Sequence, residues 1–384
     1  MSRFSDLVSK PARDLAAHFP TPAAKQASPE TQPHLIKLDS NENPFGPSPL
    51  AVEAMQSALA ATHLYPDDDC AQLRSKLAAF HSVSPEQVLV TAGSTEMLSL
   101  LCHTMLAPGL NAVTSERSFI IYRMLVYATG AQLIQAPMRK HKDAFDLDAI
   151  LAAINPQTRI VFLANPNNPT GTMVDAAAVE RFLAEVPGHV VVVLDEAYYE
   201  FAEYFAERRR VEYSRSLNCL RQGACMVVLR TFSKVHGLAG LRVGYGLGPA
   251  ELLAYCARMR NTFSVSSIAQ AAALAALDDH SHIARTISAN AEQAQILGVR
   301  LSELGFRTVP TWANFLYCDL GRDAGGVTEQ LRGHGISVRP LGAWGAPTCM
   351  RVSIGTAEQN RLFLEAIERV TGNGHPPASA HMEG

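Results

Sequence analysis

The chain has 384 residues, enough for about two to three domains of ordinary size and for a large buried core. Hydrophobic residues make up 47% of it and charged residues 18%, a composition that excludes a disordered chain or a coiled coil. With 33 basic and 36 acidic residues the net charge is -3, and this balance argues against a nucleic-acid partner.

The seven cysteines are scattered along the chain and are never spaced C-x-x-C. Neither a disulfide framework nor a metal site is therefore expected, and the cysteines are typical of reduced cytosolic thiols. The first ten residues lack the apolar core of a secretion signal, and apolar runs such as 190–194 are too short to span a bilayer. We expect a cytoplasmic protein with no membrane partner.

Residues 1–35 are rich in Ala, Pro, Ser and Thr and are predicted to form an N-terminal arm without a long helix. Beyond the arm, short β-branched runs alternate with helical patterns. The expected buried strands are 88–91, 159–164, 190–194 and 226–230. The helical patterns are carried by Leu73, Leu77 and Phe80, and by Val179, Phe182 and Leu183. This alternation predicts an α/β fold with a mostly parallel, helix-covered sheet.

The pattern of strand-like and helical segments changes near residue 269. An Ala-rich helical region runs past residue 300, and strand-like segments follow at 315–318 and 350–354. We expect a smaller α+β domain here. The predicted organisation is therefore an arm (1–35), a large domain (36–268), a small C-terminal domain (269–371) and a flexible tail (372–384).

Polar residues follow the predicted strands, at the sheet edge where open α/β folds bind ligands. Asp195 ends an apolar run, and a buried carboxylate there requires a cation or hydrogen-bond donors. It is interpreted as a site residue, with a structural ion pair as the alternative. Gly93, Ser94 and Thr95 open a helix in a way that suits a phosphate, although such residues are also ordinary helix caps.

Candidate functional side chains also follow two further predicted strands. The loop 165–171 contains two Asn-Pro pairs and can hold the Asn168 amide rigidly, or it is a plain turn. Lys234 follows the run 226–230, and burial there would lower its pKa and make its amine a nucleophile. The glycines between 237 and 248 fit neither a dinucleotide nor a nucleoside-triphosphate motif.

Together these residues resemble a known family over about residues 36–370. Asn168, Asp195, Tyr198, Ser233, Lys234 and Arg242 stand in the order and spacing of the fold-type I pyridoxal-phosphate-dependent aminotransferases. Longer segments are most similar to the histidinol-phosphate aminotransferase branch of that family. These segments are KLDSNENPFGPSP (37–49), YPD (65–67), NPNNPTG (165–171), DEAYYEF (195–201) and TFSKVHGLAGLRVG (231–244).

The resemblance implies pyridoxal 5'-phosphate as cofactor, which acts as an electron sink on the substrate amine. It implies that Lys234 forms the Schiff base and moves the proton, and that Asp195 sits beside the ring nitrogen. Asn168 and Tyr198 would hydrogen-bond the cofactor's 3-oxygen. Phe119 would stack on its ring.

The resemblance also implies how anions are held. The cofactor phosphate would be bound by Ser94, Thr95, Ser233 and Arg242. Tyr65 would reach the phosphate of a neighbouring subunit, which makes the enzyme a homodimer. The substrate would be bound by three further residues, Arg351, Arg339 and Asn43.

The implied function is a ping-pong transfer of an amino group between an L-amino substrate, with histidinol phosphate favoured, and 2-oxoglutarate or glutamate. Three residues depart from that branch: Phe19 in place of an arm tyrosine, Thr95 in place of an acidic residue, and Phe119 in place of a tyrosine. The alternative is therefore an aromatic amino-acid aminotransferase. A decarboxylase of the same fold is more distant, as is a ligand-sensing module, which would need a basic helix-turn-helix domain upstream.

Overall fold

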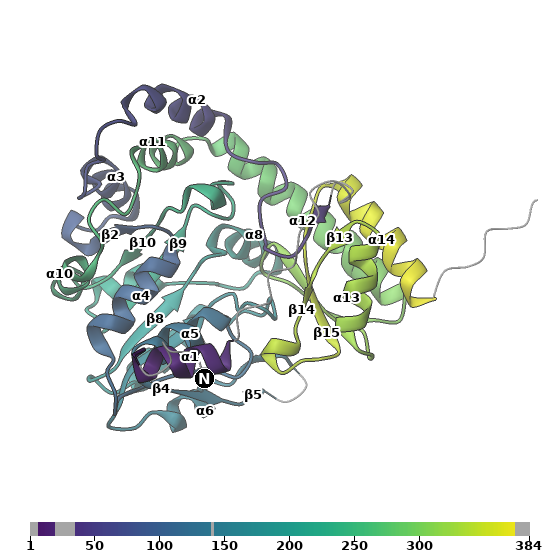
Figure 1. Cartoon of the computed structure of the whole chain (residues 1–384), viewed down its shortest axis with the longest axis horizontal. Coiled ribbons are helices and arrows are strands. Elements are labelled where there is room, and N and C mark those ends of the chain that lie inside the picture. The colour runs from purple at the N-terminus through teal and green to yellow at the C-terminus, as the bar shows by residue number, and fades with distance from the viewer. Residues whose placement is uncertain (1–6, 20–34, 140–141, 373–384) are drawn as a thin grey trace, which may run out of the picture.

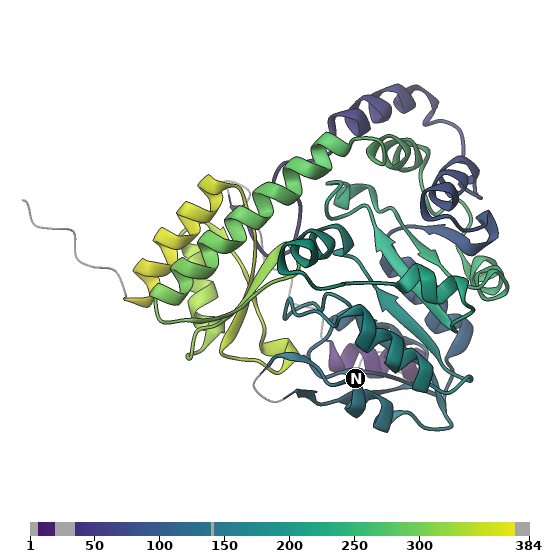
Figure 2. The ribbon, with the colours of Figure 1, turned by 180° about the vertical axis from the view of Figure 1, so that it is seen from behind.

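The computed structural model describes residues 7–19, 35–139 and 142–372. These residues form two bodies, one around a seven-stranded sheet and one around a four-stranded sheet (Figure 1). Seen from behind, the helix α12 (His280–Glu303) runs from one body to the other (Figure 2).

The large sheet has the strand order β2-β10-β9-β8-β7-β3-β4, and within it only β10 runs antiparallel to its neighbours. Its strands are β2 (Val88–Thr91), β3 (Asn111–Ser115), β4 (Gln132–Ala136), β7 (Thr158–Ala164), β8 (Val191–Asp195), β9 (Met226–Thr231) and β10 (Gly244–Leu247). The mostly parallel α/β sheet is confirmed, and the four predicted strands correspond to β2, β7, β8 and β9. Parallel strands end at one edge, so the residues that follow them are brought together.

Helices cover both faces of this sheet (Figures 1 and 2). The helices of the large body are α2 (Pro49–Ala58), which packs on α11, α3 (Ala71–His81), α4 (Ser94–Met105), α5 (Ile120–Ala128), α6 (Leu147–Ala153), α7 (Ala176–Glu185), α8 (Tyr199–Arg209), α9 (Ser216–Arg221), α10 (Ala250–Met259) and α11 (Ser267–Ala276). In α3, Leu73 and Leu77 are buried as predicted, each worth about 2 kcal/mol. Phe80 also lies in this helix, as its spacing predicts, but its side chain is 60% exposed. His81 is buried instead, because its Nε2 lies 2.9 Å from the Tyr245 hydroxyl.

The small body is an antiparallel sheet covered by helices, as the predicted α+β texture requires. Its strands are β11 (Arg307–Val309), β12 (Phe315–Asp319), β15 (Cys349–Ser353) and β14 (Arg339–Pro340), in that spatial order. Helices α13 (Ala324–Gly333) and α14 (Ala357–Thr371) pack against it together with α12. Two short pairs complete the strands: β1 (Ile36–Lys37) with β13 (Ile336–Ser337), and β5 (Met138–Arg139) with β6 (Ala144–Phe145).

The predicted Ala-rich helix is interrupted. It forms α11 and α12, and Asp279 begins the second helix by accepting the backbone N–H of His282. The core of the large sheet includes α11 as far as Leu277, and the later turns of α12 belong to the small core. We therefore propose that the two domains divide at the start of α12, about ten residues beyond the predicted boundary.

The beginning of the predicted large domain also belongs in part to the small body. Strand β1 pairs in parallel with β13, and Leu38 is buried in the small core. The chain then crosses to the large body, where the Asn43 amide nitrogen donates to the Val235 carbonyl at 2.9 Å.

The described part of the arm forms a short helix, α1 (Lys10–His18), which packs against α5 (Figure 1). Pro11 lies in its first turn, where a missing N–H costs nothing. Phe19 follows, with the Arg123 guanidinium carbon 4.8 Å from the centre of its ring. The predicted tail lies outside the described residues except for Gly372. No described helix has the length and apolar character needed to cross a membrane.

Candidate active site

A cavity of about 280 Å³ opens at the carboxyl edge of the large sheet, facing β15 of the small body. It is lined by predicted site residues from both bodies. These are Ser94, Thr95, Phe119, Asn168, Asp195, Tyr198, Ser233, Lys234, Arg242 and Arg351. The crossing segment contributes three further lining residues, Ser40, Asn41 and Glu42. Residues that are far apart in the chain therefore meet at one place, between the two cores.

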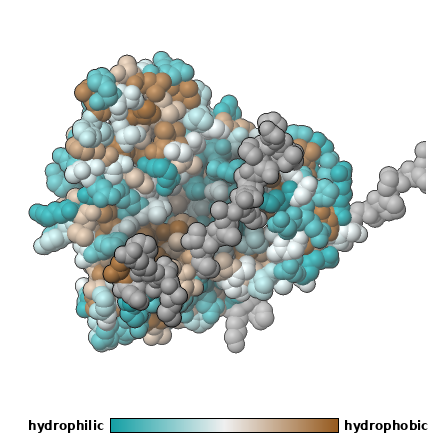
Figure 3. Space-filling view, in the orientation of Figure 1, coloured by the Kyte–Doolittle hydropathy of each residue, from teal (hydrophilic) through white to brown (hydrophobic). Residues whose placement is uncertain are grey.

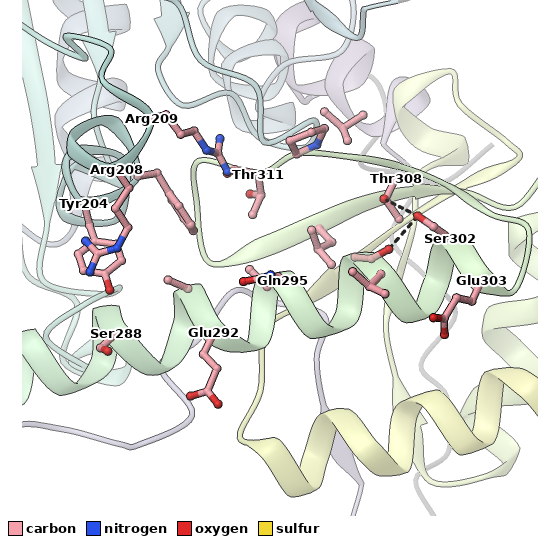
Figure 4. A pocket seen from close by; sticks show the side chains of 18 residues that line it. Tyr204, Arg208, Arg209, Ser288, Glu292, Gln295, Ser302, Glu303, Thr308 and Thr311 are labelled. Atoms are coloured by element: carbon pink, nitrogen blue, oxygen red, sulfur yellow. Dashed lines mark hydrogen bonds between the residues drawn. The ribbon is translucent and has the colours of Figure 1, made fainter.

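A larger groove, of about 1010 Å³, lies elsewhere, between α8, α12 and β11 (Figure 4). No described residue on its wall is a lysine or an aspartate. Its charged lining residues are Arg208, Arg209, Glu292 and Glu303 (Figure 4). Size therefore does not identify the site, and the smaller cavity holds the chemistry.

Lys234 stands in the turn after β9 and reaches the crossing segment. Its ammonium donates to the carbonyls of Asn41, at 3.1 Å, and Ser40, at 3.3 Å. Among the described residues no carboxylate forms an ion pair with it. Burial, together with the positive charges of Arg351 and Arg242, lowers the pKa of Lys234 to about 7. A large share of the amine is therefore uncharged near neutral pH, as a nucleophile or proton acceptor requires.

Asp195 is the last residue of β8 and is 5% exposed. Its carboxylate accepts the Tyr122 hydroxyl at 2.8 Å and the backbone N–H of Ala197 at 3.2 Å. Burial raises the pKa of Asp195 to about 6, and the two hydrogen bonds oppose this rise. No ion pair of the described residues includes it. The predicted structural ion-pair alternative is therefore wrong, and the carboxylate can accept a cationic partner from the cavity.

Arg351 and Asn168 form the opposite wall. One Arg351 nitrogen donates to the Asn168 side-chain oxygen at 2.6 Å and another to the Asp39 carbonyl at 2.6 Å. The Arg351 Nε is buried without a hydrogen-bond partner among the described residues. Burial lowers the pKa of Arg351 to about 10. An anion that accepts from this nitrogen would relieve the unmet donor.

A second anion position lies at the start of α4. Gly93 has φ +78°, and a Cβ there would overlap the Arg242 guanidinium. Arg242 donates to the Ala239 carbonyl at 3.0 Å and to the Ser233 hydroxyl at 3.4 Å. The free N–H groups and the helix dipole at Ser94 add further positive potential beside this guanidinium.

Three predicted residues do not line the cavity. The Asn43 amide nitrogen donates to Val235 and its oxygen accepts the Phe45 N–H, so it holds the crossing segment, and its substrate role stays a prediction. Arg339 lies opposite Arg351 in the β14–β15 pair and donates to the Asp39 carbonyl at 3.3 Å. Tyr65 is 83% exposed. The role of Arg339 and that of Tyr65 stay predictions.

Sequence reasoning missed Asn41, Ser353 and Tyr122. Asn41 donates through its side chain to the Tyr198 hydroxyl at 2.9 Å, and Ser353 hydrogen-bonds to Asn41. Asn41 lies within the segment that carried the resemblance, so its position there was the available signal. Tyr122 has the spacing of a core aromatic on α5, and no pattern distinguishes its hydroxyl.

The chain matches known proteins along most of its length. Residues 33–367 match the family described as aminotransferase class I and II. A histidinol-phosphate aminotransferase 2 of Pseudomonas aeruginosa is 46% identical over 338 residues, which cover 88% of this chain and 89% of that protein. A histidinol-phosphate aminotransferase of Moorella thermoacetica is 43% identical and covers 88% of this chain, with 85% of that protein matched.

Solved structures show the same fold. The crystal structure of a histidinol-phosphate aminotransferase from Sinorhizobium meliloti, in complex with pyridoxal 5'-phosphate, superposes with a TM-score of 0.84 at 28% identity. The match covers 97% of this chain and 98% of that one. The likeness therefore extends over both bodies.

Proposed function

The chain belongs to the aminotransferase class I and II family, and we propose that it transfers the amino group of L-histidinol phosphate to 2-oxoglutarate. It is a pyridoxal-phosphate-dependent transaminase of the histidinol-phosphate aminotransferase branch. One observation carries the proposal most: a lysine and a carboxylate line one cavity with two arginines, and neither forms an ion pair with any residue that the structure describes. Buried charges without an oppositely charged partner are costly, and they persist where a ligand supplies that partner.

The cavity wall fits pyridoxal phosphate group by group. When bound, the cofactor supplies an electron sink for the electrons left as the substrate loses its α-proton. Arg242, Ser233 and the start of α4 would hold its phosphate. The unpaired Asp195 would keep a proton on the ring nitrogen.

Three more residues would orient the cofactor ring. Phe119 is on the cavity wall and would cover one face of the ring. Tyr198 and Asn168 would hydrogen-bond its 3-oxygen. Arg351 already donates to Asn168, so an anion bound to that arginine would also act on the amide that holds the cofactor.

Lys234 would be the covalent attachment point and the proton carrier. A pKa of about 7 lets one amine both accept the α-proton and return it near neutral pH. Burial keeps bulk water from competing for that proton. Arg351 would bind the anionic group of each substrate in turn, because its planar fork suits both carboxylate and phosphate.

The identity of the amino substrate is supported by relatives at 39–46% identity that are named histidinol-phosphate aminotransferases. Because Phe19, Thr95 and Phe119 depart from the branch pattern, the experiment also tests an aromatic amino acid as the substrate. We would mix the cofactor-loaded enzyme with L-histidinol phosphate or with L-phenylalanine and follow the single-turnover change in visible absorption. Faster conversion by histidinol phosphate is expected. A faster reaction with phenylalanine would reassign the substrate while leaving the transaminase intact.

Covalent attachment is tested separately. Borohydride reduction of the loaded enzyme, followed by proteolysis and mass spectrometry, should fix the cofactor to the peptide that contains Lys234. Lys76, which is paired with Asp278, serves as the internal control and should remain unmodified. Labelling at another lysine would overturn the assignment.

We further propose that the enzyme is a cytoplasmic homodimer in which Tyr65 reaches the neighbouring cofactor phosphate. Apolar surface gathers over the corner formed by α2 (Figure 3). In the segment that follows α2, Leu59, Leu64 and Tyr65 are exposed, and Phe263 stacks on Tyr65 with 4.6 Å between the ring centres. Light scattering should give twice the chain mass, and Tyr65→Phe should weaken cofactor retention without changing that mass. A monomer would overturn the shared site.

A further inference from the structure

The Asn41 side chain is buried in the crossing segment and has no place in the roles proposed above. It is 1% exposed and its backbone has φ +55°, a left-handed conformation that asparagine tolerates better than most residues. This conformation turns its carbonyl toward Lys234 and its amide toward Tyr198.

The hydrogen bonds around Asn41 determine which way its amide faces. The backbone N–H of Asn41 donates to Ser353 Oγ at 2.8 Å. The Ser353 hydroxyl in turn donates to Asn41 Oδ1 at 3.0 Å. With Oδ1 on the serine side, the NH₂ group faces Tyr198, and its Nδ2 lies 2.9 Å from the hydroxyl oxygen.

We propose that Asn41, held by Ser353, is a positioning residue that directs the Tyr198 hydroxyl hydrogen into the cavity. A phenol has one hydrogen, and an amide N–H cannot accept it. Tyr198 must therefore accept from Asn41 and donate elsewhere. The inference rests on the proposed function, because the acceptor in the cavity is the cofactor's 3-oxygen.

No other side chain of the described residues hydrogen-bonds to the Tyr198 hydroxyl. Its ring is packed edge-on against Phe315, with 5.2 Å between the ring centres. The charged groups that face it are Arg351, Asp195 and Lys234, whose ammonium lies 5.6 Å from the ring centre. These charges act on Tyr198 through space, so the direction of its hydrogen depends on Asn41.

The test is a pH titration of the visible absorption of the cofactor-loaded enzyme, compared between variants. A hydrogen-bond donor to the cofactor's 3-oxygen stabilises the negative charge on that oxygen and so favours loss of the proton beside it. Losing the donor therefore raises the pH midpoint of the absorption change. Asn41→Asp keeps the shape but presents an acceptor, which takes the Tyr198 hydrogen. We expect its midpoint to rise by about one pH unit, and Ser353→Ala to raise it by less.

Asn41→Gly separates hydrogen-bond direction from added charge, and glycine tolerates φ +55° if the aspartate variant fails to fold. Asn41→Gly should raise the pH midpoint when Tyr198 is present. It should cause no further rise in a protein that already carries Tyr198→Phe. Ser337→Ala is the matched control, since that hydroxyl donates to Asp39 of the same segment at 2.6 Å. Its midpoint should equal that of the wild type.

The outcomes separate the two proposals. A wild-type protein that binds no chromophore would overturn the proposed function. A normal wild-type spectrum with unchanged midpoints in Asn41→Asp and Asn41→Gly would overturn only the role of Asn41. An equal shift from Asn41→Gly with and without Tyr198→Phe would show that Asn41 does not act through Tyr198, and would also overturn it.

Discussion

The two cavities of this molecule differ in how their charges are satisfied. In the larger groove, Arg208 lies 3.4 Å above the Tyr204 ring, and Arg209 lies 4.3 Å from the Trp312 ring and donates to the Thr311 carbonyl at 3.0 Å. In the smaller cavity, Lys234 and Asp195 line the same space, and neither forms an ion pair with a described residue. The Arg351 Nε has no hydrogen-bond partner among the described residues. The two arginines of the groove therefore have partners within the protein, whereas Arg351 of the cavity keeps one donor for a ligand, and this difference marks the site better than volume does.

The largest expected effect on activity comes from replacing Lys234 in the smaller cavity. Lys234→Ala should reduce the steady-state turnover number about 10⁴-fold or more, because no other amine lines the cavity to attach the cofactor or carry the proton. The matched control is Lys76→Ala, which removes a lysine that pairs with Asp278. It should stay within about twofold of the wild type. Comparable losses in both variants would remove the distinction.

Neutralising the carboxylate should separate activity from stability. Asp195→Asn keeps the hydrogen bond from Tyr122 but cannot hold a proton on the ring nitrogen, so we expect the turnover number to fall about 10³-fold. Without cofactor the same variant should be more stable than the wild type near neutral pH. The upper limit is about 3 kcal/mol, from the rise in the pKa of Asp195 to about 6.

The sign of this pH dependence follows from the raised pKa. The folded protein binds the proton more tightly than the unfolded chain, so the wild type keeps its full stability below about pH 4 and loses part of it as the pH rises through about 6. Urea unfolding of both cofactor-free proteins across that range measures the difference. Parallel curves would mean that Asp195 is already paired.

Arg351→Lys tests the place in the smaller cavity where a substrate anion would bind. A lysine can replace the charge but cannot donate to Asn168, to the Asp39 carbonyl and to a substrate anion together. We expect kcat/KM to fall about 10²-fold, mostly through a higher KM. Arg339→Lys should cost less, because Arg339 does not line the cavity. Equal losses from both would extend the anion site to β14.

The smallest catalytic effect is expected in the groove. Arg209→Ala should leave kcat and KM within about twofold while lowering the free energy of unfolding by about 1 kcal/mol, since it removes a hydrogen bond and two ring contacts. Steady-state kinetics and urea unfolding of one preparation measure both quantities. A large loss of activity would mean that the groove serves the reaction after all.

Much of the large sheet could be predicted because its central strands are apolar on both faces. Other strands carry no such signal. β3 contains Asn111, Thr114 and Ser115, and the Thr114 hydroxyl donates to the Phe162 carbonyl, so polar residues are buried at little cost. β10 contains Gly244 and Gly246 because α4 lies against it, where a Cβ on Gly244 would come within 2.6 Å of the Ser94 nitrogen.

The site was predictable where chemistry follows a strand along the chain, as for Lys234 and Asp195. Asn41 was not, because its function depends on Ser353, which only the pairing of the crossing segment with the small body brings near. Asn43 was predicted to bind substrate from its motif alone, although its amide is used within the protein. Local pattern thus points to Lys234 and Asp195, which line the cavity, but not to side chains such as Asn41 that are brought there by pairing between distant segments.

The pairing of β1 with β13 also bears on how the enzyme is made. Residue 36 is synthesised 300 residues before residue 336, its partner in the β1–β13 pair. Until residue 336 has been synthesised, β1 has no strand to join, although Asn43 can already bind the Val235 carbonyl of the large body. The cavity also needs Arg351 of β15, so we expect the large sheet to be able to form first and activity to arise only after the small body has folded against it.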